Sequence, residues 1–119
     1  MKKILLLFLF VLGCEQKNRL DELEKKLYQL NDVYVLINQN EMNQLGINKN
    51  DYKDYIALKT LVVYERKEIF VFYDGNDSLK EKLIQMKKEN MEYIEMNNYI
   101  YYGINDESVI KLVEDTLNK

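Results

Sequence analysis

Twice along this chain, two short runs rich in β-branched and aromatic residues are followed by a segment with helical periodicity. The strand-like runs lie at 58–64 and 69–73 in the first unit, and at 91–96 and 99–104 in the second. Paired runs of this composition are typical of a β-hairpin, and apolar residues three and four positions apart predict a one-sided helix. The sequence therefore predicts two successive ββα units.

Turn and cap residues separate these runs. The charged residues 65–68 form the predicted tip of the first hairpin, and 97–98 the turn of the second, because asparagine tolerates the left-handed backbone of a two-residue turn. Ser78 and Glu81 fit a capping box for the first helix, and Asn105 fits the N-cap of the last. The expected buried stripes are Leu79, Leu83 and Met86 in the first helix, which ends near Asn90, and Val109, Val113 and Leu117 in the last.

The region before these units contains a leucine stripe with spacings of three, four and three. Its members are Leu20, Leu23, Leu27 and Leu30. The stripe predicts a helix that either docks on its own domain or supports self-association. Residues 33–37 predict a buried strand, 41–45 a helical turn that stops at Gly46, and 50–56 a second short helix capped at its start.

Together these elements predict the fold class. Their order is α-β-α-ββα-ββα, with short connections, which favours a single domain over residues 19–119. We expect an α+β fold: a two-layer sandwich in which helices cover one face of a sheet of about five antiparallel or mixed strands.

The N-terminus has the pattern of an export signal. Two lysines, Lys2 and Lys3, precede the unbroken apolar run 4–12, which ends at Gly13 and Cys14. A run this short does not span a bilayer as a helix, which needs about 20 residues. The sequence therefore predicts a signal peptide over 1–13 and a short tether over 14–18.

Residues 11–14, Val-Leu-Gly-Cys, resemble the lipobox of bacterial lipoproteins. The resemblance implies that Cys14 carries fatty acyl chains such as palmitate, and that cleavage follows Gly13. Several acyl chains give stable anchoring, since each buried CH₂ contributes about 0.8 kcal/mol. The implied location is the cell envelope, on the plasma membrane or the outer membrane, with the domain outside the cytoplasm.

The span 41–118 is similar to a family of small bacterial lipoproteins of unknown function. The similarity lies at residues 45–47 and 54–55, at the strand pair around Val63 and Phe70, and at 99–100 before the closing helix. These positions determine a fold and imply no activity.

The composition excludes several chemistries. The chain has no histidine and one cysteine, Cys14, so it offers neither a Ser-His-Asp triad nor a Cys/His zinc site. Its net charge of −3 becomes −5 once Lys2 and Lys3 leave with the signal peptide. A mildly acidic domain binds nucleic acid poorly, because neutralisation of phosphates by positive charge supplies most of that affinity. The sequence predicts no catalytic residue, metal site or cofactor.

Tyrosine is the most unusual feature of the composition, with ten copies. Tyr93, Tyr99 and Tyr101 lie on the second predicted hairpin, beside Tyr102. Tyrosine is enriched at binding surfaces, and it is also a good strand former. The hairpin is therefore either a candidate binding surface or an ordinary part of the sheet.

Three functions are consistent with these patterns. The first is a non-enzymatic binding or assembly module whose partner is an envelope protein or, less favoured, cell-wall glycan. The second is an envelope hydrolase with paired carboxylates, for which the candidates are Glu92 with Glu95 and Asp74 with Asp77. The third is an inhibitor or immunity lipoprotein with an acidic patch, for which the candidates are Glu65, Glu68 and residues 74–77.

Overall fold

The computed structural model describes residues 18–30, 34–60 and 67–118. The predicted signal peptide and most of the predicted tether, with Gly13 and Cys14, lie outside the described residues. So do Val63 and Glu65, which belong to the predicted first hairpin.

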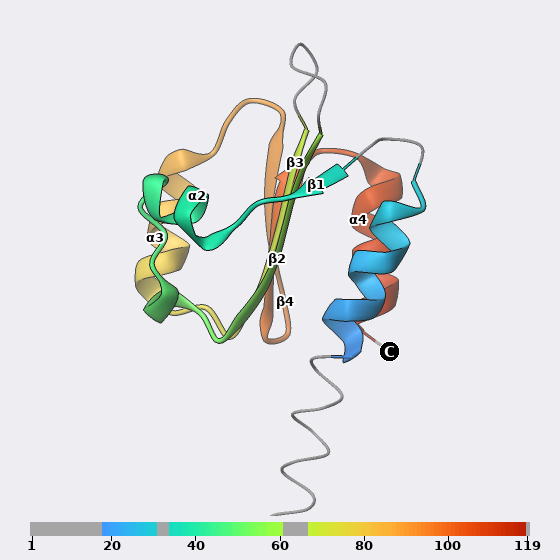
Figure 1. Ribbon diagram of the computed structural model, residues 1–119, viewed down its shortest axis with the longest axis horizontal. Helices are drawn as coiled ribbons and strands as arrows, with labels where there is room; N and C mark the ends of the chain where they lie inside the picture. Colours follow the sequence, from blue (N-terminus) through green and yellow to red (C-terminus); the bar gives the residue numbers. More distant parts are fainter. Residues whose placement is uncertain (1–17, 31–33, 61–66, 119) are drawn as a thin grey trace, which may run out of the picture.

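The described chain forms an α+β fold around a five-stranded antiparallel sheet, which confirms the predicted class (Figure 1). The strands are β1 (Tyr34–Leu36), β2 (Asp54–Thr60), β3 (Glu68–Tyr73), β4 (Met91–Met96) and β5 (Tyr99–Ile104), in the order β1-β2-β3-β5-β4. The helices are α2 (Gln39–Gln44), α3 (Asp77–Met86), α4 (Glu107–Leu117), a helical segment at 18–28, and the 3-10 turn η1 (Lys49–Asp51).

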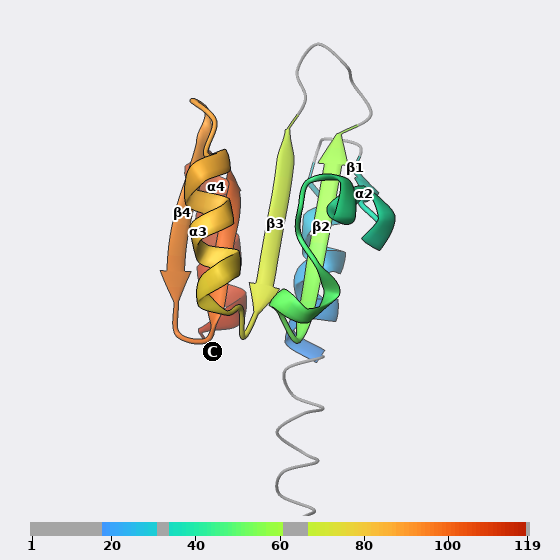
Figure 2. The ribbon, with the colours of Figure 1, turned by 90° about the vertical axis from the view of Figure 1, so that its left-hand side faces the viewer.

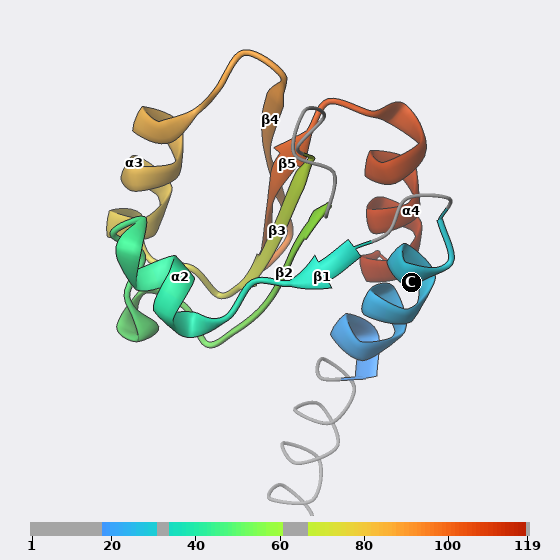
Figure 3. The same cartoon turned by 45° about the horizontal axis from the view of Figure 1, so that its top comes forward.

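Helices cover both faces of the sheet, so the expected two-layer arrangement with helices on one face is wrong (Figures 1 and 3). The 18–28 helix and α4 pack on one face, and α2 and α3 on the other. The reason lies in the central strands. In β3, Ile69 and Val71 belong to one apolar cluster while Phe70 and Phe72 belong to the other. A strand that is apolar on both sides needs cover on both sides.

The leucine stripe docks on its own domain. Leu20, Leu23 and Leu27 are buried in the cluster that includes Val109 and Val113 of α4, and Leu30 packs against it. This outcome confirms the first of the two expectations for the stripe. The three buried leucines do not form an exposed surface for self-association.

Several local expectations were wrong by a few residues. The short helix expected at 50–56 is only the turn η1, because β2 already begins at Asp54 and pairs with β3. Asn76 caps α3 in place of Ser78, and Asp106 caps α4 in place of Asn105. The helix α3 ends at Met86, short of the expected Asn90. In each case a neighbouring residue with equal capping chemistry, or sheet pairing, prevails over the local pattern.

Two turn predictions are confirmed. Asn97 adopts a φ of 54° in the β4–β5 turn, and Gly46 adopts a φ of 87° after α2. Both are left-handed backbone conformations, which asparagine and glycine adopt at low cost.

Gly103 occupies a point in β5 where a side chain has little room. A Cβ there would lie 3.0 Å from the Glu68 carbonyl oxygen and 2.9 Å from the Tyr101 hydroxyl oxygen. That hydroxyl donates to the Ile104 carbonyl at 2.7 Å, so it does not move freely. Gly103→Ala is expected to lower the free energy of unfolding by about 1–3 kcal/mol, measured by urea denaturation. An unchanged denaturation midpoint would contradict the tight approach.

Candidate functional site

The tyrosines of the β4–β5 hairpin lie mostly in the core, so the hairpin is an ordinary part of the sheet, and the alternative of a binding surface at Tyr93, Tyr99 and Tyr101 is wrong. Tyr99 is 4% exposed, Tyr101 is fully buried and Tyr102 is 2% exposed, while Tyr93 is half-buried. The Tyr102 hydroxyl donates to the Met86 carbonyl at 3.0 Å. The reason is position, because β5 lies between β3 and β4 with helices on both faces. The run 99–104 contains no charged residue, which is the signal for a central strand.

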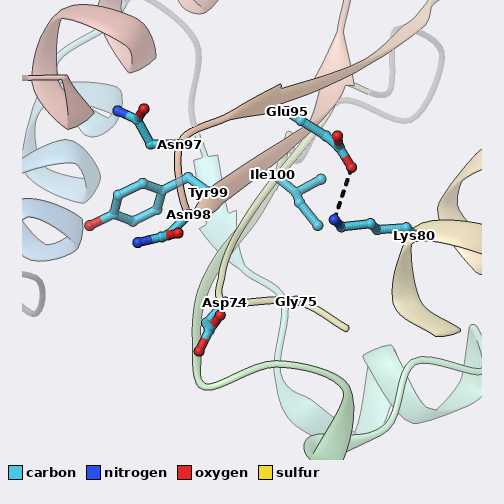
Figure 4. Close-up of a pocket in the computed structure, with 8 residues that line it drawn as sticks. All are labelled: Asp74, Gly75, Lys80, Glu95, Asn97, Asn98, Tyr99 and Ile100. Atoms are coloured by element: carbon cyan, nitrogen blue, oxygen red, sulfur yellow. Dashed lines mark ion pairs between the residues drawn. The ribbon is translucent and has the colours of Figure 1, made fainter. Parts of the chain in front are cut away.

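A small polar pocket of about 110 Å³ lies where β3 leads into α3, beside the β4–β5 turn (Figure 4). Lys80 and Glu95 form an ion pair at 3.2 Å within it, and the Tyr93 hydroxyl donates to the Glu95 carboxylate at 2.7 Å. Tyr99 also lines the pocket, but its ring points away from the ion pair (Figure 4). The two opposite charges in the pocket, Lys80 and Glu95, are therefore already engaged with each other.

The predicted carboxylate pairs do not assemble a hydrolase site. Hydrogen bonds from Tyr93 and Lys80 hold the pKa of Glu95 below its usual range, whereas a general acid needs a raised pKa. Glu92 and Glu95 are three residues apart on one strand, so their side chains lie on opposite faces of the sheet. Asp74 forms an ion pair with Lys53 at 2.9 Å.

The predicted acidic patch is neutralised where the structure describes it. Glu68 forms an ion pair with Lys88 at 3.7 Å, and Asp74 forms one with Lys53. Asp77 occupies the first turn of α3, where a negative charge stabilises the helix dipole. These contacts leave little uncompensated negative charge for a basic partner site.

Larger hollows lie between α2 and α3, at the end of the sheet where β3 and β4 begin. Figure 2 shows α3 over β4 and α2 beside β2, with β3 between them. Three adjoining cavities of about 260, 310 and 350 Å³ share Glu68 and Lys88 in their walls. We call them the α2–α3 groove. The largest cavity is lined by Gln44, Leu45, Glu68, Phe70, Met86, Lys88, Met91 and Tyr102.

Adjacent strands and two helix ends build this groove. Phe70 of β3 and Tyr102 of β5 are direct partners in the sheet, with ring centroids 5.7 Å apart, and they form the floor. Met86 is the last residue of α3, and its carbonyl accepts a hydrogen bond from the Tyr102 hydroxyl. Leu45 is the C-cap of α2 and stays 43% exposed.

The rim of the groove carries matched charges. Glu41 pairs with Lys59 on the α2 side, and Glu68 pairs with Lys88 on the α3 side. No group of three acidic or cysteine side chains in the described ranges converges as a metal site. An apolar cavity with a charged rim is suited to binding an apolar group.

Sequence reasoning missed this groove. Its lining residues come from β3, β4, β5 and the ends of α2 and α3, and no local pattern brings these segments together. One usable signal was Leu45, an apolar residue directly before a helix-ending glycine.

Within the described residues, no helix is both long enough and apolar enough to cross a membrane. Comparison of the chain with protein-family models, with curated proteins and with solved structures gives no match.

Proposed function

We propose that this protein is a lipid-anchored, non-enzymatic binding module of the bacterial envelope, whose α2–α3 groove accepts an apolar side chain of a partner protein. The lipobox at residues 11–14 supports the anchor. The apolar walls and the volume of about 350 Å³ support the binding role, since ligand pockets begin at roughly 300 Å³.

The observation that carries the proposal is the position of the groove relative to the start of the domain. Arg19 donates to the Leu117 carbonyl at 3.3 Å, so the start of the 18–28 helix lies at the end of α4. Asn97 donates to Asn118 at 2.9 Å, which places the end of α4 beside the β4–β5 turn. That turn and the groove lie at opposite ends of the sheet (Figure 1).

A short tether would fix the orientation of the domain relative to the bilayer. Residues 14–17 separate the acylation site from the 18–28 helix, and they span at most about 14 Å when extended. An anchor on Cys14 therefore holds the β4–β5 turn near the bilayer and leaves the groove facing away from it. A groove in this orientation is accessible to other envelope proteins.

A protein partner is favoured over cell-wall glycan. Sugar recognition uses exposed aromatic faces, and the aromatic rings of the groove, Phe70 and Tyr102, are at most 2% exposed. The exposed residues of the wall are Gln44, Leu45 and Lys88. These suit an apolar side chain that inserts between Leu45 and Met86.

The anchor is tested by Cys14→Ser. The wild-type protein is expected in the membrane fraction with an acylated N-terminal Cys14, and the variant is expected to move largely to the soluble fraction. Mass spectrometry of the N-terminal peptide reads the modification directly. An unmodified thiol, or an intact Met1 in the membrane-bound protein, would contradict the anchor.

The groove is tested by site-specific photo-crosslinking in membranes of the source bacterium. A photoreactive residue at Gln44, which lines the groove, is expected to capture a defined protein, whereas one at Gln85 on the exposed side of α3 is not. Leu45→Asp is expected to reduce the capture about tenfold or more, and Ile84→Asp to leave it unchanged. Ile84 is the matched control, because it is 58% exposed and lies outside the groove. Equal capture from positions 44 and 85 would refute the groove as the binding site.

A further inference from the structure

The two edges of the sheet differ in what becomes of their outward backbone groups. On the β2 side, β1 pairs with residues 58–60, and the Ile37 N–H donates to the Ala57 carbonyl at 2.8 Å. The next N–H of β2 that points away from β3 is that of Tyr55, and it donates to the Asp54 carboxylate at 2.8 Å. The edge strand on this side is β1 itself, and its length of three residues makes it a short edge, a common protection against unwanted pairing.

The other edge, β4, leaves its outward groups open. The Asn105 N–H donates to the Asn90 carbonyl at 2.8 Å, and β4 and β5 continue from there in unbroken antiparallel register. Hydrogen-bonded pairs alternate in such a ladder, so the backbone groups of Tyr93 and Glu95 point away from β5. In Figure 2 no drawn element lies beyond β4, although α3 and α4 flank it on its two faces.

β4 also lacks several of the usual devices that block an edge. It has no lysine, no proline and no bulge over its six residues, Met91–Met96. Its two charged side chains are both acidic, and they lie on opposite faces, Glu92 on one and Glu95 on the other. A strand added beside β4 would therefore meet the Glu92 carboxylate on one face, while Glu95 on the other face is already paired with Lys80 and accepts from the Tyr93 hydroxyl.

A second copy of this chain fits the edge poorly. Two β4 strands pair antiparallel around a two-fold axis, which points the starts of the two 18–28 helices in opposite directions. This step rests on the proposed lipid anchor: tethers of about 14 Å do not reach one bilayer from both ends of such a dimer. The occupant is therefore a segment of another protein.

We propose that β4 is a strand-addition site for an extended, basic segment of a partner protein. The N–H and C=O groups of Tyr93 and Glu95 supply main-chain hydrogen bonds, which give affinity in this mode of recognition. Glu92, whose carboxylate forms no ion pair among the described residues, selects lysine or arginine side chains on one face of the added strand. This site is separate from the α2–α3 groove and does not depend on its occupant.

The test uses the chain from residue 14 with Cys14→Ser, followed by amide hydrogen exchange in NMR. In the free chain, the amides of Tyr93 and Glu95 are expected to exchange fast, and those of Glu92 and Ile94 slowly. A terminally blocked heptapeptide that alternates valine and lysine is expected to protect Tyr93 and Glu95. A heptapeptide with glutamate in place of lysine is expected to bind at least tenfold more weakly.

Two variants separate the backbone contribution from the charge. Glu95→Pro removes an outward N–H that the β4–β5 ladder does not use, so the fold is retained, and peptide affinity is expected to fall at least fivefold below that of Glu95→Gln. Glu95→Gln keeps the N–H and removes the charge together with its ion pair to Lys80. Equal binding of the lysine and glutamate peptides would overturn the proposal, as would peptide binding without protection of Tyr93 and Glu95. Protection of the Tyr93 and Glu95 amides in the free chain that is lost on dilution would show that a second copy pairs with β4, and this would refute the proposal. The anchor is tested by membrane fractionation of the wild-type protein, and none of these outcomes depends on that experiment. Failure of the anchor and failure of the strand-addition site are therefore distinguishable.

Discussion

Replacement of Tyr101 by alanine is expected to lower the free energy of unfolding by about 3–5 kcal/mol, the range for removing a large aromatic side chain from a core. Tyr101 is fully buried, and it belongs to the cluster that joins the sheet to the 18–28 helix and α4. Burial raises the pKa of its hydroxyl, so the side chain stays neutral in the folded protein. Urea denaturation followed by circular dichroism measures the change.

Tyr101→Phe is the matched control, because it keeps the ring and removes only the hydroxyl. That hydroxyl donates to the Ile104 carbonyl at 2.7 Å, and its loss is expected to cost about 1 kcal/mol. The difference between the two variants therefore measures the packing of the ring. Equal losses for alanine and phenylalanine would show that the ring contributes little, which would contradict a core position.

The second large effect is expected at Asp51, which is 7% exposed. Its carboxylate accepts from the Lys82 ammonium at 2.8 Å and from the Asn48 N–H at 3.0 Å, so it joins η1 to α3. Asp51→Ala leaves both donors without this acceptor and is expected to lower the free energy of unfolding by about 3 kcal/mol. Glu95→Gln breaks the more exposed pair with Lys80 and serves as a control with a much smaller effect.

The contribution of Asp51 also depends on pH. Burial alone would raise its pKa, but the hydrogen bonds from Lys82 and Asn48 outweigh burial and bring the pKa below the ordinary 3.8. A carboxyl whose pKa is lower in the folded state stabilises the fold fully above its unfolded pKa. That stabilisation is lost as the pH falls through the lower, folded pKa. Unfolding measured from pH 6 down to pH 2 is expected to show a steeper acid loss in wild type than in Asp51→Ala, and parallel curves would contradict the shift.

The antiparallel sheet was predictable because its strands carry strong local signals. The runs 91–96 and 99–104 match β4 and β5 residue for residue, and Asn97 takes the left-handed turn that its chemistry favours. The start of β2 was not predictable in the same way. Residues 54–57 became strand because they pair with β3, a contact between segments that are distant in sequence.

The candidate site was far less predictable than the fold. The tyrosine-rich run was consistent with a binding surface and with an ordinary strand, because the burial of these tyrosines in β5 depends on helices that cover both faces of the sheet. The groove depends on where α2 and α3 end, and helix ends are the features that local patterns fix least well. Lipidation at Cys14 remains a prediction from sequence, since that residue lies outside the described ranges.

The sheet separates two apolar clusters, and this division has a consequence for how the domain opens. The cluster beneath the groove is covered by α3 and by α2, and α2 has only six residues, too few to persist without its packing. The other cluster is held by the 18–28 helix and the eleven residues of α4. The domain should therefore loosen in two steps: amides around Met42 exchange through a low-energy local opening, while those around Val113 wait for global unfolding. Such a division lets the face that carries α2 adjust its shape while the face that carries the 18–28 helix and α4 stays rigid.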